Sequence, residues 1–298
     1  MRILHFSDLH LRQRWREVPL KDWFGKRAIG GINLALGRAS VFDEAPEKTA
    51  SLGRFCNELG IDFAIFTGDY TALGIDSELR MARAAVAPLV EAPLGYAGVP
   101  GNHDLYSLDV VREGRFKRHF GDTLKTDMPE YRVDDSPWPI VRLVGREVAV
   151  VGVNSARPNP IPWRASTGKI PVEQLLRLRR ILADPRLRER FVFVITHYAP
   201  RLANGEPDRL THGMLNADAF LEACANLPRG AMLCGHVHWC YMLHIEGVRP
   251  PLFCAGSATK AGVEGLWVFD IEGGRVRATP GVWTGEDYAL ENAAAVDL

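Results

Sequence analysis

The sequence predicts an α/β protein in which helices cover β-sheet, and three observations support this fold class. Short apolar runs of strand length alternate with patterns of helical period along most of the 298 residues. The C-terminal third is rich in strands, which indicates a second sheet. No repeat, low-complexity tract or clean linker interrupts the pattern, and 47% of the residues are hydrophobic, which is enough for a large core. We therefore expect a single domain over residues 1–298.

The expected elements begin with a strand in RILHFSDLH, residues 2–10, which runs into a polar loop. A helix follows over 47–60, because Leu52, Phe55 and Leu59 fall on one helical face and the pattern ends in glycine. The elements after it are, in order, a strand at 61–69, a helix at about 76–91, a strand at 94–104, a helix near 107–119, a hairpin at 140–156 turning at Gly145, a proline-rich loop at 158–171, a helix at 172–184, a strand at 190–200, a helix at 216–227, the segment 231–247, and two or three further strands of which the last lies near 263–270.

Composition excludes several classes of protein. The 36 basic side chains are balanced by 36 acidic ones, so we expect no nucleic-acid partner, since such proteins usually carry a basic excess. The five cysteines contain no Cys-x-x-Cys pair, which indicates reduced thiols and no thiolate zinc site. Asp8 comes too early for a signal peptide, and no apolar run approaches the roughly 18 residues of a spanning helix. We expect a cytoplasmic protein, with room for a peripheral membrane contact.

Acids, amides and imidazoles gather where the predicted strands end. Ligands collect outside the carboxyl ends of strands in open α/β sheets. Each pair alone is a common turn or cap, but five of the nine histidines belong to this set. Such side chains suit Mn, Fe or Zn, and two metals about 4 Å apart need a bridging carboxylate and further ligands on each side. The residues concerned are Asp8, His10, Asp69, Asn102, His103, Asp104, His197, His236 and His238.

The ordered motifs SDLH, TGD, GNHD, THYAP and GHVH closely resemble those of the calcineurin-like metallophosphoesterases. The resemblance runs from residue 3 to about residue 260. It implies a two-sheet αββα sandwich with flanking helices, and an enzyme that hydrolyses phosphate esters with two divalent metal ions. It also implies that one metal is held by Asp8, His10, Asp69 and His238, and the second by Asp69, Asn102, His197 and His236.

In this resemblance the GNHD motif carries the catalytic residues. His103 would point at the substrate without binding metal, as a proton donor or a stabiliser of transition-state charge. Asp104 would stand behind His103, fix its tautomer and raise its pKa. Tyr70 replaces a residue that is often small and aliphatic in the family, so we expect it to affect the fit of the substrate.

Further substrate residues are expected on loops at the rim of the site. Arg157 and Arg164 lie in the loop 154–171, which includes the proline-rich stretch, and His212 lies in the loop 200–214 between the THYAP and GHVH motifs. Rim loops commonly select substrate, and arginine recognises phosphate well. The alternative is that these are ordinary solvated side chains of surface loops.

Residues 12–38 form a basic, apolar insertion directly after the first metal-binding motif. They contain seven basic and two acidic side chains, interleaved with aromatic and aliphatic residues such as Trp15, Trp23 and Phe24. The segment could contact an anionic membrane surface or an acyl-bearing substrate. The alternative is an insertion helix packed on the edge of the domain.

The substrate is expected to be a small molecule with a phosphodiester or pyrophosphate bond. The motifs and the predicted single domain resemble those of bacterial cyclic-nucleotide phosphodiesterases, whereas the insertion has the character of pyrophosphatases that act on lipid-linked nucleotides. A non-catalytic scaffold of the same fold should lack metal ligands, which this chain retains. A DNA-processing nuclease should be larger and carry a basic groove. The sequence predicts no particular oligomeric state.

Overall fold

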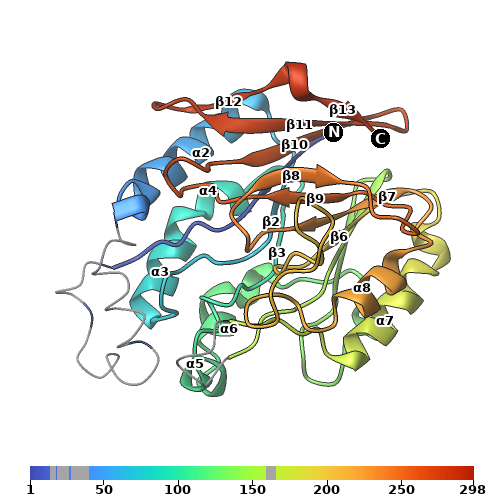
Figure 1. The fold of residues 1–298 in the computed structure, drawn as a ribbon, viewed down its shortest axis with the longest axis horizontal. Coiled ribbons are helices and arrows are strands. Elements are labelled where there is room, and N and C mark those ends of the chain that lie inside the picture. Colours follow the sequence, from blue (N-terminus) through green and yellow to red (C-terminus); the bar gives the residue numbers. More distant parts are fainter. Residues whose placement is uncertain (14–17, 19–26, 28–39, 159–165) are drawn as a thin grey trace.

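Two β-sheets stack face to face, with helices on their outer faces (Figure 1). The computed structural model describes residues 1–13, 18, 27, 40–158 and 166–298. The first sheet has the strand order β12-β11-β10-β1-β2-β3, with β13 paired to β11, and the second has the order β4-β5-β6-β7-β9-β8. The two sheets and the flanking helices confirm the predicted αββα sandwich.

The first sheet combines the N-terminal strands with the C-terminal ones. Strand β1 pairs in parallel with β2 and antiparallel with β10, so the strand that leads to the first metal motif lies in the middle of the sheet. The bounds of its strands are β1 Arg2–Phe6, β2 Phe63–Phe66, β3 Tyr96–Gly98, β10 Leu266–Glu272, β11 Arg275–Trp283, β12 Tyr288–Leu290 and β13 Val296–Asp297.

The second sheet is built from the middle of the chain. Its strands β5, β6, β7 and β9 run parallel to one another, and β4 and β8 are antiparallel edges. Strands buried on both faces are near-continuous apolar runs, as FVFVI in β6 illustrates. The bounds are β4 Ile140–Val144, β5 Val148–Gly152, β6 Phe191–Ile195, β7 Gly230–Cys234, β8 Cys240–Leu243 and β9 Leu252–Ala255.

The helices cover the outer face of each sheet. Residues of α2 and α3 join the same apolar core as β1 and β2, and α7 and α8 lie side by side and pack on the second sheet (Figure 1). The helices are α2 Ala45–Leu59, α3 Asp76–Ala85, α4 Ala87–Val90, α5 Leu108–Arg112, α6 Arg115–Phe120, α7 Val172–Leu182 and α8 Ala217–Cys224, and the 3-10 turns are η4 Ser40–Phe42, η5 Gly121–Thr123, η6 Pro129–Tyr131, η7 Pro185–Leu187 and η8 Asn292–Ala294.

Aromatic side chains join the two sheets. Phe193 of β6 meets Phe269 of β10 edge to face at 4.9 Å, and Phe253 of β9 meets Phe269 at 5.1 Å. Such contacts add about 0.5–1.5 kcal/mol each to the hydrophobic gain from burial. The interface between the sheets is therefore a packed apolar core, and the polar side chains of the motifs lie at the strand ends.

Three expectations for individual elements were wrong. The helix expected at 76–91 divides into α3 and α4 near Pro88, since proline cannot donate to the helical ladder. The helix expected near 107–119 divides at Gly114, which has a positive φ of 60°. The last strand does not lie near 263–270, because β11, β12 and β13 follow it and extend the first sheet.

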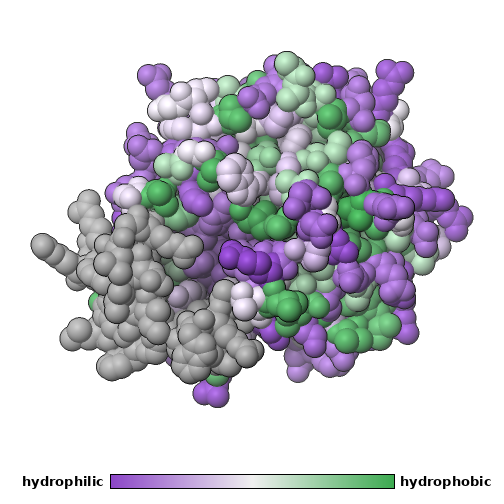
Figure 2. All heavy atoms as spheres, in the orientation of Figure 1, coloured by the Kyte–Doolittle hydropathy of each residue, from purple (hydrophilic) through white to green (hydrophobic). Residues whose placement is uncertain are grey.

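The described surface is mainly hydrophilic on the face that Figure 2 shows, with apolar residues in small separate groups. Within the described residues, no helix is long and apolar enough to cross a membrane. Of the segment 12–38, for which we predicted a membrane contact, the structure describes only residues 12, 13, 18 and 27. The membrane contact therefore stays a prediction.

Candidate metal centre

Each predicted metal ligand follows the carboxyl end of a strand. Asp8 and His10 follow β1, Asp69 follows β2, and Asn102 follows β3 in the first sheet. The ligands of the second sheet follow β6 and β7 and are His197, His236 and His238. Because the sheets stack with these ends at the same side, the structure brings all seven side chains together.

The residues expected at the first metal face one another closely. Nε2 of His10 lies 3.0 Å from Nε2 of His238 and 3.5 Å from Oδ1 of Asp8. The same Asp8 oxygen is 3.2 Å from Nε2 of His238, and Oδ2 of Asp69 is 3.8 Å from Nε2 of His10. Four nitrogen and oxygen ligand atoms therefore point at one small volume.

The residues expected at the second metal share Asp69 with the first. Oδ2 of Asp69 lies 3.4 Å from Nε2 of His197, which is 3.1 Å from Oδ1 of Asn102. The carbonyl of Thr67 lies 2.7 Å from Nδ1 of His197 and fixes the proton there, so Nε2 keeps its lone pair toward the centre. Nε2 of His236 donates to the carbonyl of His212 at 3.0 Å, which leaves its Nδ1 as the ligand atom.

The backbone of the ligand loops is held in an unusual conformation. Six described non-glycine residues have positive φ, and five of them are predicted ligands: Asp8 (55°), His10 (46°), Asp69 (64°), His236 (73°) and His238 (58°). Such residues cost of order 1–3 kcal/mol each and persist only where their surroundings fix them. Here the N–H of Asp8 donates to the carbonyl of Gly68, and that of His10 donates to the carbonyl of Asp69.

Two glycines of the motifs are required by close packing against ligands. A Cβ at Gly101 would overlap the carboxylate of Asp69, and a Cβ at Gly235 would overlap Ser7 and the carboxylate of Asp8. The glycines of GNHD and GHVH therefore allow neighbouring loops to approach the two carboxylates. The role of these glycines is steric, because a side chain at either position would collide with a ligand carboxylate.

The charge of the site fits divalent cations. Asp8 and Asp69 are both buried, and among the described residues their charge partners are imidazoles, with no lysine or arginine. Oδ1 of Asp8 is buried without a hydrogen bond. Burial acts to raise the pKa of Asp8, but the imidazoles of His10 and His238 outweigh it and hold that pKa well below its usual range. Two buried, ionised carboxylates converging on imidazole nitrogens suit a pair of metal ions.

His103 is placed beside this centre and is oriented by a backbone carbonyl. Its Nδ1 lies 2.6 Å from the carbonyl oxygen of Ala72, so Nδ1 carries the proton and Nε2 faces away from that loop. A nitrogen of His103 lies within 4.8 Å of ligand atoms of His10 and Asp69. The imidazole is therefore held next to the metal ligands.

Asp104 has a different place from the one we expected. Its carboxylate accepts hydrogen bonds from the backbone N–H groups of Asp69, Tyr70, Thr71 and Gly101 and from the Thr71 hydroxyl. The prediction that Asp104 fixes the tautomer of His103 was wrong, because the Ala72 carbonyl occupies Nδ1. Asp104 instead shapes the loop that carries Asp69 and Ala72.

Tyr70 does not line the site. Its side chain is fully buried, its hydroxyl lies 2.6 Å from that of Tyr96, and its ring packs 4.0 Å from Phe66 and 4.2 Å from Phe120. The prediction that it contacts substrate was therefore wrong. Asp69 points toward the ligands, and the next side chain along the chain points the other way, into the core.

His212 lies against the second-metal side of the centre. Its ring stacks on that of His236 at 4.2 Å, and its Nδ1 is 2.6 Å from Oδ2 of Asp208. Asp208 is a site residue that sequence reasoning missed, although it precedes His212 by four positions in the same loop. Together with the His212 carbonyl, this pair fixes the orientation of His236.

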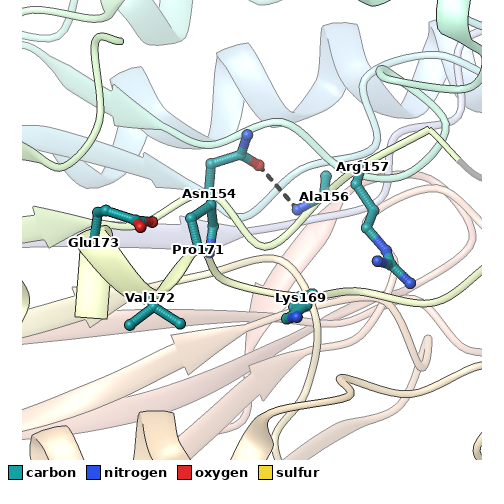
Figure 3. Close-up of a pocket in the computed structure, with 7 residues that line it drawn as sticks. All are labelled: Asn154, Ala156, Arg157, Lys169, Pro171, Val172 and Glu173. Carbon is teal, nitrogen blue, oxygen red and sulfur yellow. Dashed lines mark hydrogen bonds between the residues drawn. The ribbon is translucent and has the colours of Figure 1, made fainter. Parts of the chain in front are cut away.

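Arg157 borders a surface pocket of about 370 Å³ beside the carboxyl end of β5 (Figure 3). Its guanidinium donates to the carbonyl and hydroxyl of Thr167. Lys169 lines the same pocket, as do Asn154, Ala156, Pro171, Val172 and Glu173. Arg164, the other predicted arginine, lies outside the described residues.

Sequence reasoning also missed two aromatic residues, Phe42 and Trp239. The ring of Phe42 lies 4.7 Å from that of His10 and 6.2 Å from that of His238. Trp239 directly follows His238 and is 64% exposed. The sequence GHVHW shows a tryptophan next to the predicted ligand His238, but only the structure shows that this tryptophan is exposed.

Comparisons with known proteins agree with this geometry. The family described as calcineurin-like phosphoesterase matches residues 1–240. A dimetal phosphatase from Danio rerio is similar in structure, with a TM-score of 0.62 and 11% identity over 93% of this chain and 95% of that one. A purple acid phosphatase from yellow lupin seeds gives a TM-score of 0.60 and 10% identity over 100% of this chain and 53% of that one. Among curated proteins, no sequence matches the chain significantly.

Proposed function

Because the chain belongs to the calcineurin-like phosphoesterase family and is a metal-dependent phosphoester hydrolase, we propose that it hydrolyses a phosphodiester or pyrophosphate bond in a small molecule. Two divalent ions, Mn, Fe or Zn, would be held by the seven ligands described above, with Asp69 between them. The observation that carries the proposal is the convergence of these side chains on two buried carboxylates, with His103 beside them.

The chemistry divides between the ions and the protein. Bound ions supply the positive charge that activates a water and neutralises the phosphoryl oxygens. His103, held through Nδ1 by the Ala72 carbonyl, presents Nε2 to the reacting phosphate. In its protonated form it donates a proton to the departing oxygen or a hydrogen bond to a phosphoryl oxygen.

Residues near the centre favour a substrate that has an aromatic group at one end and polar oxygens at the other. Phe42 packs against His10 and offers aromatic surface on which a nucleobase can stack, a contact worth about 1–3 kcal/mol per base, and the exposed Trp239 follows His238 directly in the chain. His212, stacked on His236, offers a polar group for phosphate or hydroxyl oxygens, and we infer the same role for Arg157, which lines the pocket beside β5. This arrangement favours a nucleotide diester, including cyclic nucleotides, within the proposed class.

A metal-reconstituted screen tests the proposal. The purified protein, stripped by a chelator and reloaded with Mn, would be assayed on cyclic nucleotides, nucleotide-diphosphate lipids, and aryl phosphate mono- and diesters. We expect two ions per chain, loss of activity on chelation, recovery with Mn, and the highest kcat/KM on a diester or pyrophosphate. A clear preference for monoesters would contradict the proposed bond type, and undiminished hydrolysis by metal-free protein would contradict the proposed metal dependence.

A further inference from the structure

Three described residues near or within the insertion at 12–38 are tied to the loop that holds His103. The N–H of Gln13 lies 3.4 Å from the carboxylate of Glu78. Val18 is buried in a small apolar cluster whose other members are Ala72, Leu73, Ile75 and Tyr106. Arg27 is 5% exposed. At these positions the insertion packs on the domain.

Arg27 bridges this loop and helix α5. Its Nε donates to the carbonyl of Leu73 at 3.2 Å, and its Nη1 lies 2.8 Å from the carboxylate of Asp109. A guanidinium so deeply buried is stable only when paired, so its two partners are held at a fixed separation. Arg115 binds the same Asp109 carboxylate at 3.1 Å and makes an ion pair with Glu113.

The loop fixed by Arg27 is the one that orients the catalytic imidazole. The Leu73 carbonyl is one peptide unit from the Ala72 carbonyl, which accepts the Nδ1 proton of His103. The N–H of Leu73 donates to Glu78 at 2.8 Å. The Tyr106 ring, in the same cluster as Val18, lies 5.6 Å from the His103 ring.

We propose that Arg27, supported by Val18, is a positioning residue for His103, so that this part of the insertion braces the catalytic imidazole. The inference rests on the proposed function of His103. Arg27 binds the Leu73 carbonyl and so fixes the backbone of this loop. The fixed backbone keeps the neighbouring Ala72 carbonyl within hydrogen-bond distance of His103 Nδ1. Without this brace the loop can relax, and His103 loses the geometry that aims Nε2 at the phosphate. Misplacement of a reacting group by about 1 Å costs roughly 100-fold in rate.

The test compares Arg27→Met with Arg115→Met, a matched control that loses an ion pair to the same Asp109. For Arg27→Met we expect kcat to fall about 10- to 100-fold, with KM and metal content nearly unchanged. The loss should be greatest for diesters with poor leaving groups, which depend most on His103. In a His103→Ala background, Arg27→Met should cause no further loss, since both changes remove the same function. Arg115→Met should lower stability but keep the wild-type kcat.

Hydrogen–deuterium exchange of metal-free protein gives a readout that does not depend on activity. Exchange across residues 71–75 should rise in Arg27→Met and stay at the wild-type level in Arg115→Met. If Arg27→Met does not fold, Arg27→Lys keeps a charge for Asp109 but loses the planar fork that reaches Leu73, and it should show the same leaving-group-dependent loss. Unchanged exchange, or an additive loss in the His103→Ala background, would overturn the inference. Absence of both phosphodiester and pyrophosphate hydrolysis by wild type would instead overturn the proposed function.

Discussion

The loops that carry the metal ligands and the segments that border them are built in different ways. The ligand loops are short, buried and fixed by backbone hydrogen bonds at positive φ, as Asp8 and Asp69 illustrate. Residues next to these loops are more exposed, as Trp239, which directly follows His238 and is 64% exposed, illustrates. Side chains at the centre cannot change without disturbing their neighbours, whereas those at the border can. The difference supports the proposal that the ligand loops carry the chemistry and that residues beside them select the substrate.

The largest effect is expected from Asp69→Asn, which removes a negative charge from between the two proposed cations. Both ions should bind more weakly, and hydrolysis should fall by about four orders of magnitude or more, because several kcal/mol of charge stabilisation are lost. Elemental analysis and single-turnover assays measure the two effects. Two tightly bound ions together with full activity would show that Asp69 does not bridge them.

His103→Ala should separate catalysis from metal binding. We expect nearly normal metal content and a loss of about two to four orders of magnitude in turnover, the usual range for acid–base assistance. The loss should shrink for substrates with good leaving groups if His103 donates the proton. An equal loss for all leaving groups would favour charge stabilisation, and a loss of metal would make His103 a ligand.

Asp208→Ala tests whether a residue of the border orients a ligand. Asp208 holds the ring of His212, whose carbonyl accepts from His236, so its removal should weaken binding of one ion about 10- to 100-fold. Asp218→Ala is the control, because Asp218 makes an exposed ion pair with Arg201. Metal titrations of both variants measure this effect. Equal metal affinities in the two variants would show that Asp208 does not orient a ligand.

The smallest effect on hydrolysis is expected from Glu78→Gln, which alters the contact to the Leu73 N–H and is detected through the pH dependence of stability. Burial raises the pKa of Glu78 to about 7, although backbone N–H groups such as that of Leu73 act to lower it. Folded protein therefore binds this proton more tightly than unfolded protein, whose Glu78 has the ordinary value of 4.5. Its contribution to stability is fully present below pH 4.5 and is lost as the pH rises to about 7, at about 1.4 kcal/mol per pH unit.

Urea unfolding of metal-free protein at several pH values measures this contribution. The difference in stability between wild type and Glu78→Gln should move in favour of the glutamine variant as the pH rises from about 4.5 to 7. Parallel pH profiles for the two proteins would show that Glu78 titrates normally.

The sequence predicted which seven side chains converge, because they belong to motifs placed by strands whose ends are recognisable. It did not predict the roles of Asp104 and Tyr70, because a motif does not say on which side of a loop each side chain lies. The carbonyl of Ala72 has no signature at all, since every residue has a backbone oxygen. Arg27 was counted as part of a basic segment, and only its distances to Leu73 and Asp109 distinguish it from a solvated arginine.

The antiparallel pairing of β1 with β10 has a consequence for the order in which the protein matures. A ribosome makes β1 long before its neighbour β10, which begins at Leu266. The carbonyls of Ser7 and Asp8 accept from Ala258 and Ser257, so the backbone around the first ligand also waits for late residues. Contacts this distant in sequence form slowly. A nascent chain stalled before Ser257 would therefore lack hydrogen bonds that hold the backbone around Asp8, and its candidate metal centre would be unfinished.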